Sequence, residues 1–279
     1  MKRLIFIVLA IFLTCSFALS AQAEKLKRVS FSEVLELSSG SSVKKHSYGT
    51  HPSQFFEYWP AKNNAAEAAN VIFIHGGCWL KDYDIRHSYP LSTALTQAGF
   101  NLWSVEYRRL GEDNAAWPAS LNDVSKAIEN ILQQTNGKPT AVMGHSAGGH
   151  LALLATSKNY KYAEHIDAVI GLAAITDMQV YVAEDGSCNQ AAKTLINTAQ
   201  SDFNLAEADP KQQPLHHNTW LLQGSADNIV PMSQAEVFGV NNDNVNTLIV
   251  DDAGHFDMIH PKTDAWTVII QQLNKELKP

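Results

Sequence analysis

Residues 140–154, TAVMGHSAGGHLALL, decide the fold. The apolar run that ends at Met143 predicts a buried strand, and the leucine-rich end of the stretch predicts a helix. Between them Ser146 has Gly144 and Gly148 two positions away on either side, which is the pattern of a nucleophile elbow. Such a turn lifts the serine Oγ out of the sheet and leaves the Ala147 amide at a helix N-terminus, where a developing oxyanion can bind. An ordinary serine in a glycine-rich turn is the alternative, and the flanking strand and helix disfavour it.

Strand and helix patterns alternate along the rest of the chain. Apolar runs predict strands at 71–74, 101–105, 140–143, 166–174, 219–222 and 245–250, and helical spacing predicts helices at 87–98, 120–134 and 261–277. Strands that are apolar throughout and separated by helices predict an α/β fold, with a mostly parallel sheet covered on both faces. Before Ala61, alternating stretches such as 53–58 suit antiparallel strands at the sheet edge.

The first 23 residues are expected to be a secretory signal peptide. Lys2 and Arg3 give a positive start, an apolar run follows, and Ala21-Gln22-Ala23 is a cleavage pattern, so the domain is expected to span 24–279. A retained membrane anchor is the alternative, although the apolar run is short for a span. The mature protein is therefore expected to be secreted or periplasmic, with no stable membrane association.

The charge balance disfavours polyanionic partners. The formal net charge is −7 for the chain, and it becomes −9 once Lys2 and Arg3 are removed. A chain this acidic is not expected to bind nucleic acid or an anionic membrane, because both repel negative charge. Histidines and cysteines do not cluster at metal-ligand spacing, so we expect no metal and no organic cofactor. Oligomeric state does not follow from the sequence.

A serine nucleophile needs a base, and the base needs an orienting acid, in the chain order serine, acid, histidine for an elbow architecture. Asp227 is the candidate acid, because it stands in a loop of small residues directly after the strand at 219–222. His255 is the candidate base, since it follows the last strand and precedes the final helix. Asp251 and Asp252, at the end of the strand before His255, are the alternatives to Asp227 as the acid. His260 is the alternative to His255 as the base. The other histidines near the serine, His145 and His150, are expected to pack.

An oxyanion-binding loop is expected directly after the strand at 71–74. His75-Gly76-Gly77-Cys78-Trp79 places two glycines there, so backbone N–H groups can face a substrate without side chains between. Gly76, Gly77 and Ala147 are the expected donors. Cys78 and Trp79 are expected to line the substrate pocket. A bridge between Cys78 and Cys188 is possible after export, but the sequence does not bring the two together, so Cys78 is expected to act as a small wall residue.

These motifs together resemble the α/β-hydrolase superfamily, in its esterase/lipase branch. The His-Gly-Gly-x-Trp loop at 75–79, Glu106-Tyr107-Arg108, Trp117-Pro118-Ala119 and His255-Phe256-Asp257 are similar to kynurenine formamidase-like carboxylesterases. The resemblance runs from about Ser47 to the C-terminus. It implies an α/β-hydrolase fold and hydrolysis of a small-molecule carboxylic ester through an acyl-enzyme, with Ser146, His255 and Asp227 as the triad.

Substrate identity does not follow from these motifs, because many hydrolases share them. An arylformamidase or a small peptidase on the same triad is the alternative among enzymes, and the export signal fits poorly with a cytoplasmic formamidase. A non-catalytic binding protein on this fold is the alternative from another class; such proteins usually lose a triad member. Residues 178–217, between two core strands, are expected to form a short lid insertion that leaves the pocket accessible.

Overall fold

The computed structural model describes residues 25–238 and 244–277 of the 279-residue chain. The predicted signal peptide at 1–23 therefore lies outside the described residues. Within the described ranges, none of the helices combines the length and apolar character needed to cross a membrane.

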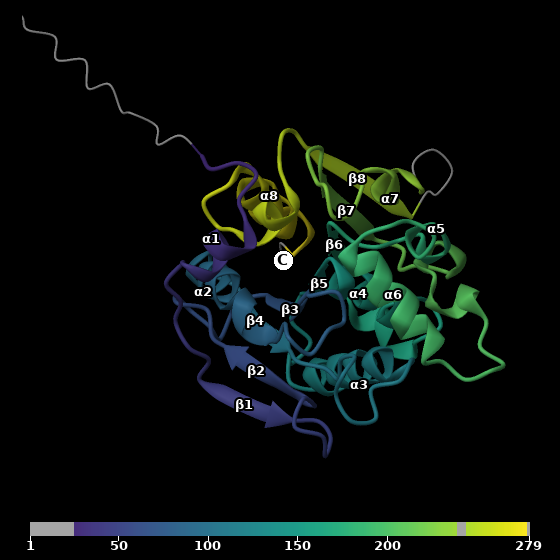
Figure 1. Cartoon of the computed structure of the whole chain (residues 1–279). Coiled ribbons are helices and arrows are strands. Elements are labelled where there is room, and N and C mark those ends of the chain that lie inside the picture. The colour runs from purple at the N-terminus through teal and green to yellow at the C-terminus, as the bar shows by residue number, and fades with distance from the viewer. Residues whose placement is uncertain (1–24, 239–243, 278–279) are drawn as a thin grey trace, which may run out of the picture.

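One twisted sheet of eight strands forms the centre of the fold, in the order β1-β2-β4-β3-β5-β6-β7-β8 (Figure 1). The strands are β1 Lys44–Ser47, β2 Phe55–Trp59, β3 Asn70–Ile74, β4 Asn101–Val105, β5 Thr140–His145, β6 Ala168–Leu172, β7 Thr219–Gly224 and β8 Val245–Val250. From β4 to β8 every neighbouring pair is parallel, whereas β1 and β2 pair antiparallel at one edge. The parallel sheet and the antiparallel edge predicted from the sequence are both confirmed.

Helices cover both faces of the sheet, because alternate side chains of the fully buried strands point to opposite sides. One core packs α1 Phe31–Leu35, α2 Tyr89–Gln97 and α8 Asp264–Glu276 against the sheet, through residues such as Leu95 and Ile269. The other core packs α3 Ala119–Leu132, α4 Ala147–Ala155, α5 Met178–Tyr181, α6 Ser187–Asn197 and α7 Ser233–Glu236. Five 3₁₀ turns are also described: η1 Ile85–Ser88, η2 Lys161–His165, η3 Leu205–Ala208, η4 Pro210–Gln212 and η5 His255–Ile259.

Two predicted helices begin later than the sequence pattern indicated. The helix expected at 87–98 is split into η1 and α2, with Pro90 in the first turn of α2. The helix expected at 261–277 begins at Asp264, because residues 261–262 form a turn and Thr263 is the N-cap. Proline favours the first turn of a helix, so the sequence signal for the start of α2 was Pro90 rather than the earlier polar residues.

Candidate active site

The elbow at Ser146 is a strained turn that the neighbouring glycines make possible. β5 ends at His145, α4 begins at Ala147, and Ser146 between them has φ 54° and ψ −122°, a conformation rare for residues with a side chain. A Cβ on Gly144 would lie 2.2 Å from the Gly148 carbonyl oxygen, and one on Gly148 would lie 2.3 Å from the His75 carbonyl oxygen. Any larger residue at either position would therefore push the turn apart.

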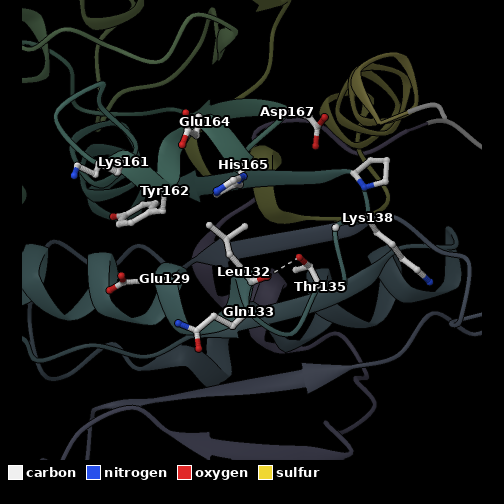
Figure 2. A pocket seen from close by; sticks show the side chains of 12 residues that line it. Glu129, Leu132, Gln133, Thr135, Lys138, Lys161, Tyr162, Glu164, His165 and Asp167 are labelled. Atoms are coloured by element: carbon white, nitrogen blue, oxygen red, sulfur yellow. Dashed lines mark hydrogen bonds between the residues drawn. The ribbon is translucent and has the colours of Figure 1, made fainter.

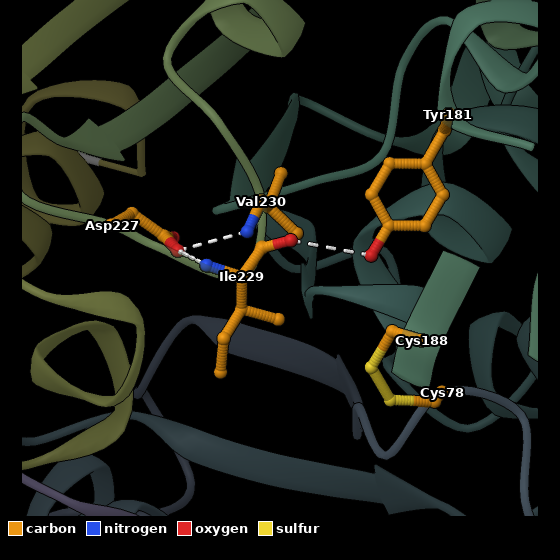
Figure 3. Close-up of a disulfide and its surroundings, with 6 residues drawn as sticks. All are labelled: Cys78, Tyr181, Cys188, Asp227, Ile229 and Val230. Carbon is orange, nitrogen blue, oxygen red and sulfur yellow. Dashed lines mark hydrogen bonds between the residues drawn. A yellow bond between two sulfur atoms is a disulfide. The ribbon is translucent and has the colours of Figure 1, made fainter. Parts of the chain in front are cut away.

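Asp227 and His255 form a buried pair at the carboxyl edge of the sheet. His255 Nδ1 lies 2.8 Å from Asp227 Oδ2, and the two side chains are 4% and 0% exposed. Asp227 follows β7, and its Oδ1 accepts the amides of Ile229 and Val230 at 2.8 and 2.9 Å (Figure 3). The Gln223 side chain donates to Oδ2 at 3.1 Å. These bonds fix the carboxylate, and the carboxylate in turn favours the imidazole tautomer in which Nδ1 carries the proton and donates it to Oδ2.

The rival acids and base have other partners. Asp252 pairs with Lys27 and Arg28 at the surface, and the Ser225 hydroxyl donates to Asp251 at 3.3 Å. The Nδ1 of His260 accepts the Lys262 amide at 3.2 Å. The structure therefore brings His255 to Asp227 rather than to the other two carboxylates.

Ser146 and His255 line the same pocket. Its volume is about 160 Å³, and its wall consists of Phe31, Gly77, Cys78, Tyr83, His87, His145, Ser146, Cys188, Ile229, His255, Phe256 and Ile259. Within the described part of the chain, Ser146 Oγ makes no direct hydrogen bond to the His255 ring. Catalytic hydrogen bonds are often long without substrate and shorten in the substrate complex. The wall is mostly apolar and aromatic, with a few polar groups, as in small-molecule sites.

The loop after β3 presents free amides beside Ser146. A Cβ on Gly76 would lie 3.2 Å from Ser146 Cβ, so the backbone at Gly76 approaches the serine closely. Gly77 has φ +106°, and a Cβ there would lie 2.3 Å from Tyr83 Cβ. Among the residues described, the amides of Gly76, Gly77 and Ala147 donate to no acceptor. Unpaired backbone donors beside a serine hydroxyl can bind an anionic oxygen.

A buried network holds this loop in place. His75 Nε2 lies 2.9 Å from Glu106 Oε1, its Nδ1 lies 2.8 Å from the Gly76 carbonyl oxygen, and the Tyr107 hydroxyl donates to the His75 carbonyl. Burial raises the pKa of the Glu106 carboxyl, but His75, Arg109 and backbone donors outweigh it and hold the pKa below its usual value. His75 therefore holds the loop through hydrogen bonds.

Three further histidines are buried as neutral side chains, two of them in the pocket wall and His150 in the core. Burial lowers the pKa of His145 well below 6.5, and the ring of His145 packs against that of His255 with centroids 4.6 Å apart. Burial lowers the pKa of His150 to about 4 and that of His87 to about 3. His145 and His150 pack, as expected. His87 also lines the pocket. The sequence did not indicate this, because a helical pattern that begins at residue 87 does not show that its first turn faces a site.

For the residues after the glycines, the structure answers one question that the sequence left open and corrects one expectation. Cys78 and Cys188 are joined by a disulfide, with Cα atoms 5.1 Å apart, a pairing that no sequence pattern indicated (Figure 3). The bridge became possible because α6 lies over the loop after β3, a contact between residues 110 positions apart. Cys78 also lines the pocket, as expected. Trp79 does not line the pocket, because its fully buried indole packs into the core against His150, with ring centroids 5.2 Å apart.

A larger pocket lies away from these residues. It has a volume of about 680 Å³ and is bounded by the end of α3, the loop before β5 and η2 (Figure 2). Its charged lining residues are of both signs, among them Glu129, Lys138, Lys161 and Asp167. None of the candidate catalytic residues lines it, so the smaller pocket is the candidate active site.

Comparison with known proteins assigns the chain to a family. Residues 57–241 match the family model described as BD-FAE. Esterase LipC of Mycobacterium tuberculosis is 26% identical over 82% of this chain and 64% of its own length. Kynurenine formamidase of Meyerozyma guilliermondii is 28% identical over 40% of this chain and 42% of its own length. The chain thus spans less than two thirds of the length of these curated relatives.

Solved structures share the fold at lower identity. Esterase B from Lactobacillus rhamnosis superposes with a TM-score of 0.72 at 19% identity, covering 88% of this chain and 89% of that chain. A truncated carbohydrate esterase from gut microbiota gives a TM-score of 0.68 at 20% identity, covering 85% of this chain and 96% of that chain. These similarities show the α/β-hydrolase fold.

Proposed function

Because the chain belongs to the BD-FAE family, within the α/β-hydrolase esterases and lipases, we propose that it is a serine hydrolase that cleaves small carboxylic esters. The observation that carries the proposal is the Asp227–His255 pair, 2.8 Å apart, because His255 lines the pocket that also contains Ser146. The names of the relatives, which include esterases and a formamidase, support the hydrolysis of an acyl group.

The proposed reaction has two steps on one set of groups. His255 Nε2 takes the proton of Ser146 as Oγ attacks the substrate carbonyl carbon, and it then protonates the leaving alcohol as the carbon–oxygen bond breaks. Asp227 holds the imidazole in the required tautomer and stabilises the imidazolium. Water, activated by the same histidine, then cleaves the acyl-enzyme and releases the acid. No step calls for a metal or an organic cofactor.

The free amides of Gly76, Gly77 and Ala147 are the proposed oxyanion donors. They become useful only when the carbonyl oxygen turns negative, so they stabilise the transition state more than the substrate. One such donor is worth about 3 kcal/mol of barrier. The neutral state of His145 keeps a second positive charge away from the imidazolium.

The pocket argues for a small reacting group. Its volume of about 160 Å³ leaves room for a short acyl chain beside Ser146. Residues 178–217 contain α5 and α6, and Cys188 of α6 reaches the pocket wall. We therefore propose that residues 178–217 form a short lid that closes one side of the pocket. Export through a signal peptide cleaved after Ala23 remains part of the proposal.

Hydrolysis rates test the proposal and its alternatives. The purified mature protein should hydrolyse p-nitrophenyl acetate and butyrate, with rates that fall as the acyl chain lengthens, and Ser146→Ala should be inactive. Faster turnover of N-formylkynurenine than of any ester would favour the arylformamidase. A wild-type protein inactive on esters, formamides and peptides alike would favour the non-catalytic binding protein. Gel migration of the exported protein beside a chain that starts at Glu24 would test the cleavage site.

A further inference from the structure

We propose that the N-terminal segment Lys25–Leu35 is a working part of the active site. This inference rests on the proposed function. In this proposal Asp257 ties the segment to the turn that carries His255, and Phe31 of the segment forms a substrate-contacting wall of the pocket. Asp257 is then a positioning residue, and Phe31 is a specificity-determining residue.

The tie is a buried carboxylate with both oxygens in use. Asp257 Oδ2 accepts the Arg28 amide at 2.8 Å, and Oδ1 accepts the Val29 amide at 2.7 Å. Asp257 is 1% exposed and belongs to η5, two residues after His255. Bonds from backbone N–H groups to a carboxylate are among the stronger hydrogen bonds in proteins, and a buried charge without them is costly. The segment and η5 are therefore fixed to each other.

The segment also lies directly against the backbone that precedes His255. A Cβ on Gly254 would lie 3.1 Å from Arg28 Cα, so this glycine lets the two backbones approach. Arg28 has φ +53°, which turns the segment sharply at the point where it meets Asp257. At the surface, Lys27 and Arg28 pair with Asp252, but exposed pairs of this kind contribute little. Of the side-chain contacts between the segment and the turn around His255, the buried carboxylate is thus the strongest.

Beyond the tie, the segment enters α1, whose first residue reaches the substrate pocket. Ser30 and Glu33 form a capping box that starts this short helix, beside α2 and α8 in Figure 1. The Phe31 ring centroid lies 5.4 Å from that of Phe256, 5.6 Å from that of Tyr83 and 5.7 Å from that of His87. These partners line the pocket with Phe31. Phe31 thus closes an aromatic wall that would otherwise open towards solvent.

This arrangement assigns a function to Asp257 in the His255-Phe256-Asp257 motif. His255 faces Asp227 and the pocket, and Phe256 packs on Phe31. Asp257 accepts the backbone amides of the segment that carries Phe31. One turn therefore sets the position of the base and of the pocket wall together.

Phe31→Ala tests the wall. Removing the ring enlarges the pocket, so the ratio of kcat/KM for p-nitrophenyl octanoate to that for p-nitrophenyl acetate should rise about tenfold. Leu35→Ala is the matched control, because Leu35 lies in the same helix and is 55% exposed; its ratio should equal that of the wild type. A wild-type ratio in Phe31→Ala overturns the proposal.

Asp257→Ala tests the positioning effect. On p-nitrophenyl acetate, kcat should fall about tenfold while KM changes less than twofold, measured well below the unfolding midpoint of the variant. Asp257→Asn, which keeps one acceptor oxygen, should recover part of this kcat. Asp251→Ala, which removes an exposed carboxylate from the turn directly after β8, should leave kcat unchanged. A folded Asp257→Ala with wild-type kcat overturns the proposal, and if this variant does not fold, Phe31→Ala decides.

The two proposals fail in different ways. If the wild-type protein hydrolyses no ester, the proposed function is wrong. If the wild-type protein is active but Phe31→Ala shows the wild-type preference, only the inference about the segment is wrong.

Discussion

The Cys78–Cys188 disulfide should be a large contributor to stability, and Cys188→Ser measures it. The bridge closes a loop of 110 residues. A cross-link of that span lowers the entropy of the unfolded chain by an amount worth about 5 kcal/mol in the loop-closure model, and measured values are commonly about 2–4 kcal/mol. For a domain of this size each kcal/mol shifts the midpoint by about 2–4 °C. We therefore expect the unfolding midpoint of Cys188→Ser to fall by about 10 °C.

The same bridge also bears on activity, because both cysteines line the pocket beside Ser146. Cys78 directly follows the two glycines whose amides are proposed oxyanion donors, so opening the bridge should lower kcat as well as stability. Calorimetry and p-nitrophenyl butyrate hydrolysis would be run on wild type, Cys188→Ser and Cys78→Ser, each with and without dithiothreitol. Dithiothreitol should move the wild type towards the variants and leave both variants unchanged. Free thiols at both positions in denatured, unreduced protein, or an unchanged midpoint in the reductant, would refute the reasoning.

Three other predictions follow from the site. Asp227→Asn should lower kcat by about 10⁴ through the wrong imidazole tautomer, whereas Asp252→Asn should be near wild type; the opposite result would move the acid to Asp252. Gly76→Ala should lower kcat about a hundredfold, since its Cβ would lie 2.9 Å from His145 Nδ1 and displace the donors, while Gly40→Ala, with no neighbour closer than 3.6 Å, is the control expected to match wild type. In the folded protein the pKa of His87 is lowered to about 3 and that of His150 to about 4. Below pH 6.5 these histidines therefore take up protons in the unfolded chain but not in the folded protein, and the free energy of unfolding decreases as the pH falls. Urea unfolding should therefore give a free energy of unfolding about 3 kcal/mol lower at pH 5 than at pH 7, and equal values would contradict this burial of neutral histidines.

The sequence predicted those features that depend on neighbouring residues. The elbow at Ser146 needs small residues two positions away, and the parallel sheet needs apolar strands between helices; both are local patterns. Asp227 and His255 could be selected because each follows a strand, and a parallel sheet brings the carboxyl ends of its strands to one edge.

The features that the sequence did not indicate depend on packing between distant segments. Cys188 pairs with Cys78 only because α6 lies over the loop after β3, and no spacing rule connects positions 110 residues apart. Trp79 turns into the core, where His150 packs against it. Phe31 lines the pocket, and the amides of Arg28 and Val29 just before it donate to Asp257, which lies more than two hundred residues away along the chain.

Labelling of the serine tests the central claim most directly. The mature protein would be treated with a fluorophosphonate probe, and the modified peptide would be located by mass spectrometry. We expect one adduct, on Ser146, at a rate that Ser146→Ala abolishes and that His255→Ala and Asp227→Asn reduce strongly. An unlabelled wild type, or an adduct on another residue with Ser146 unmodified, would contradict a nucleophile at the elbow.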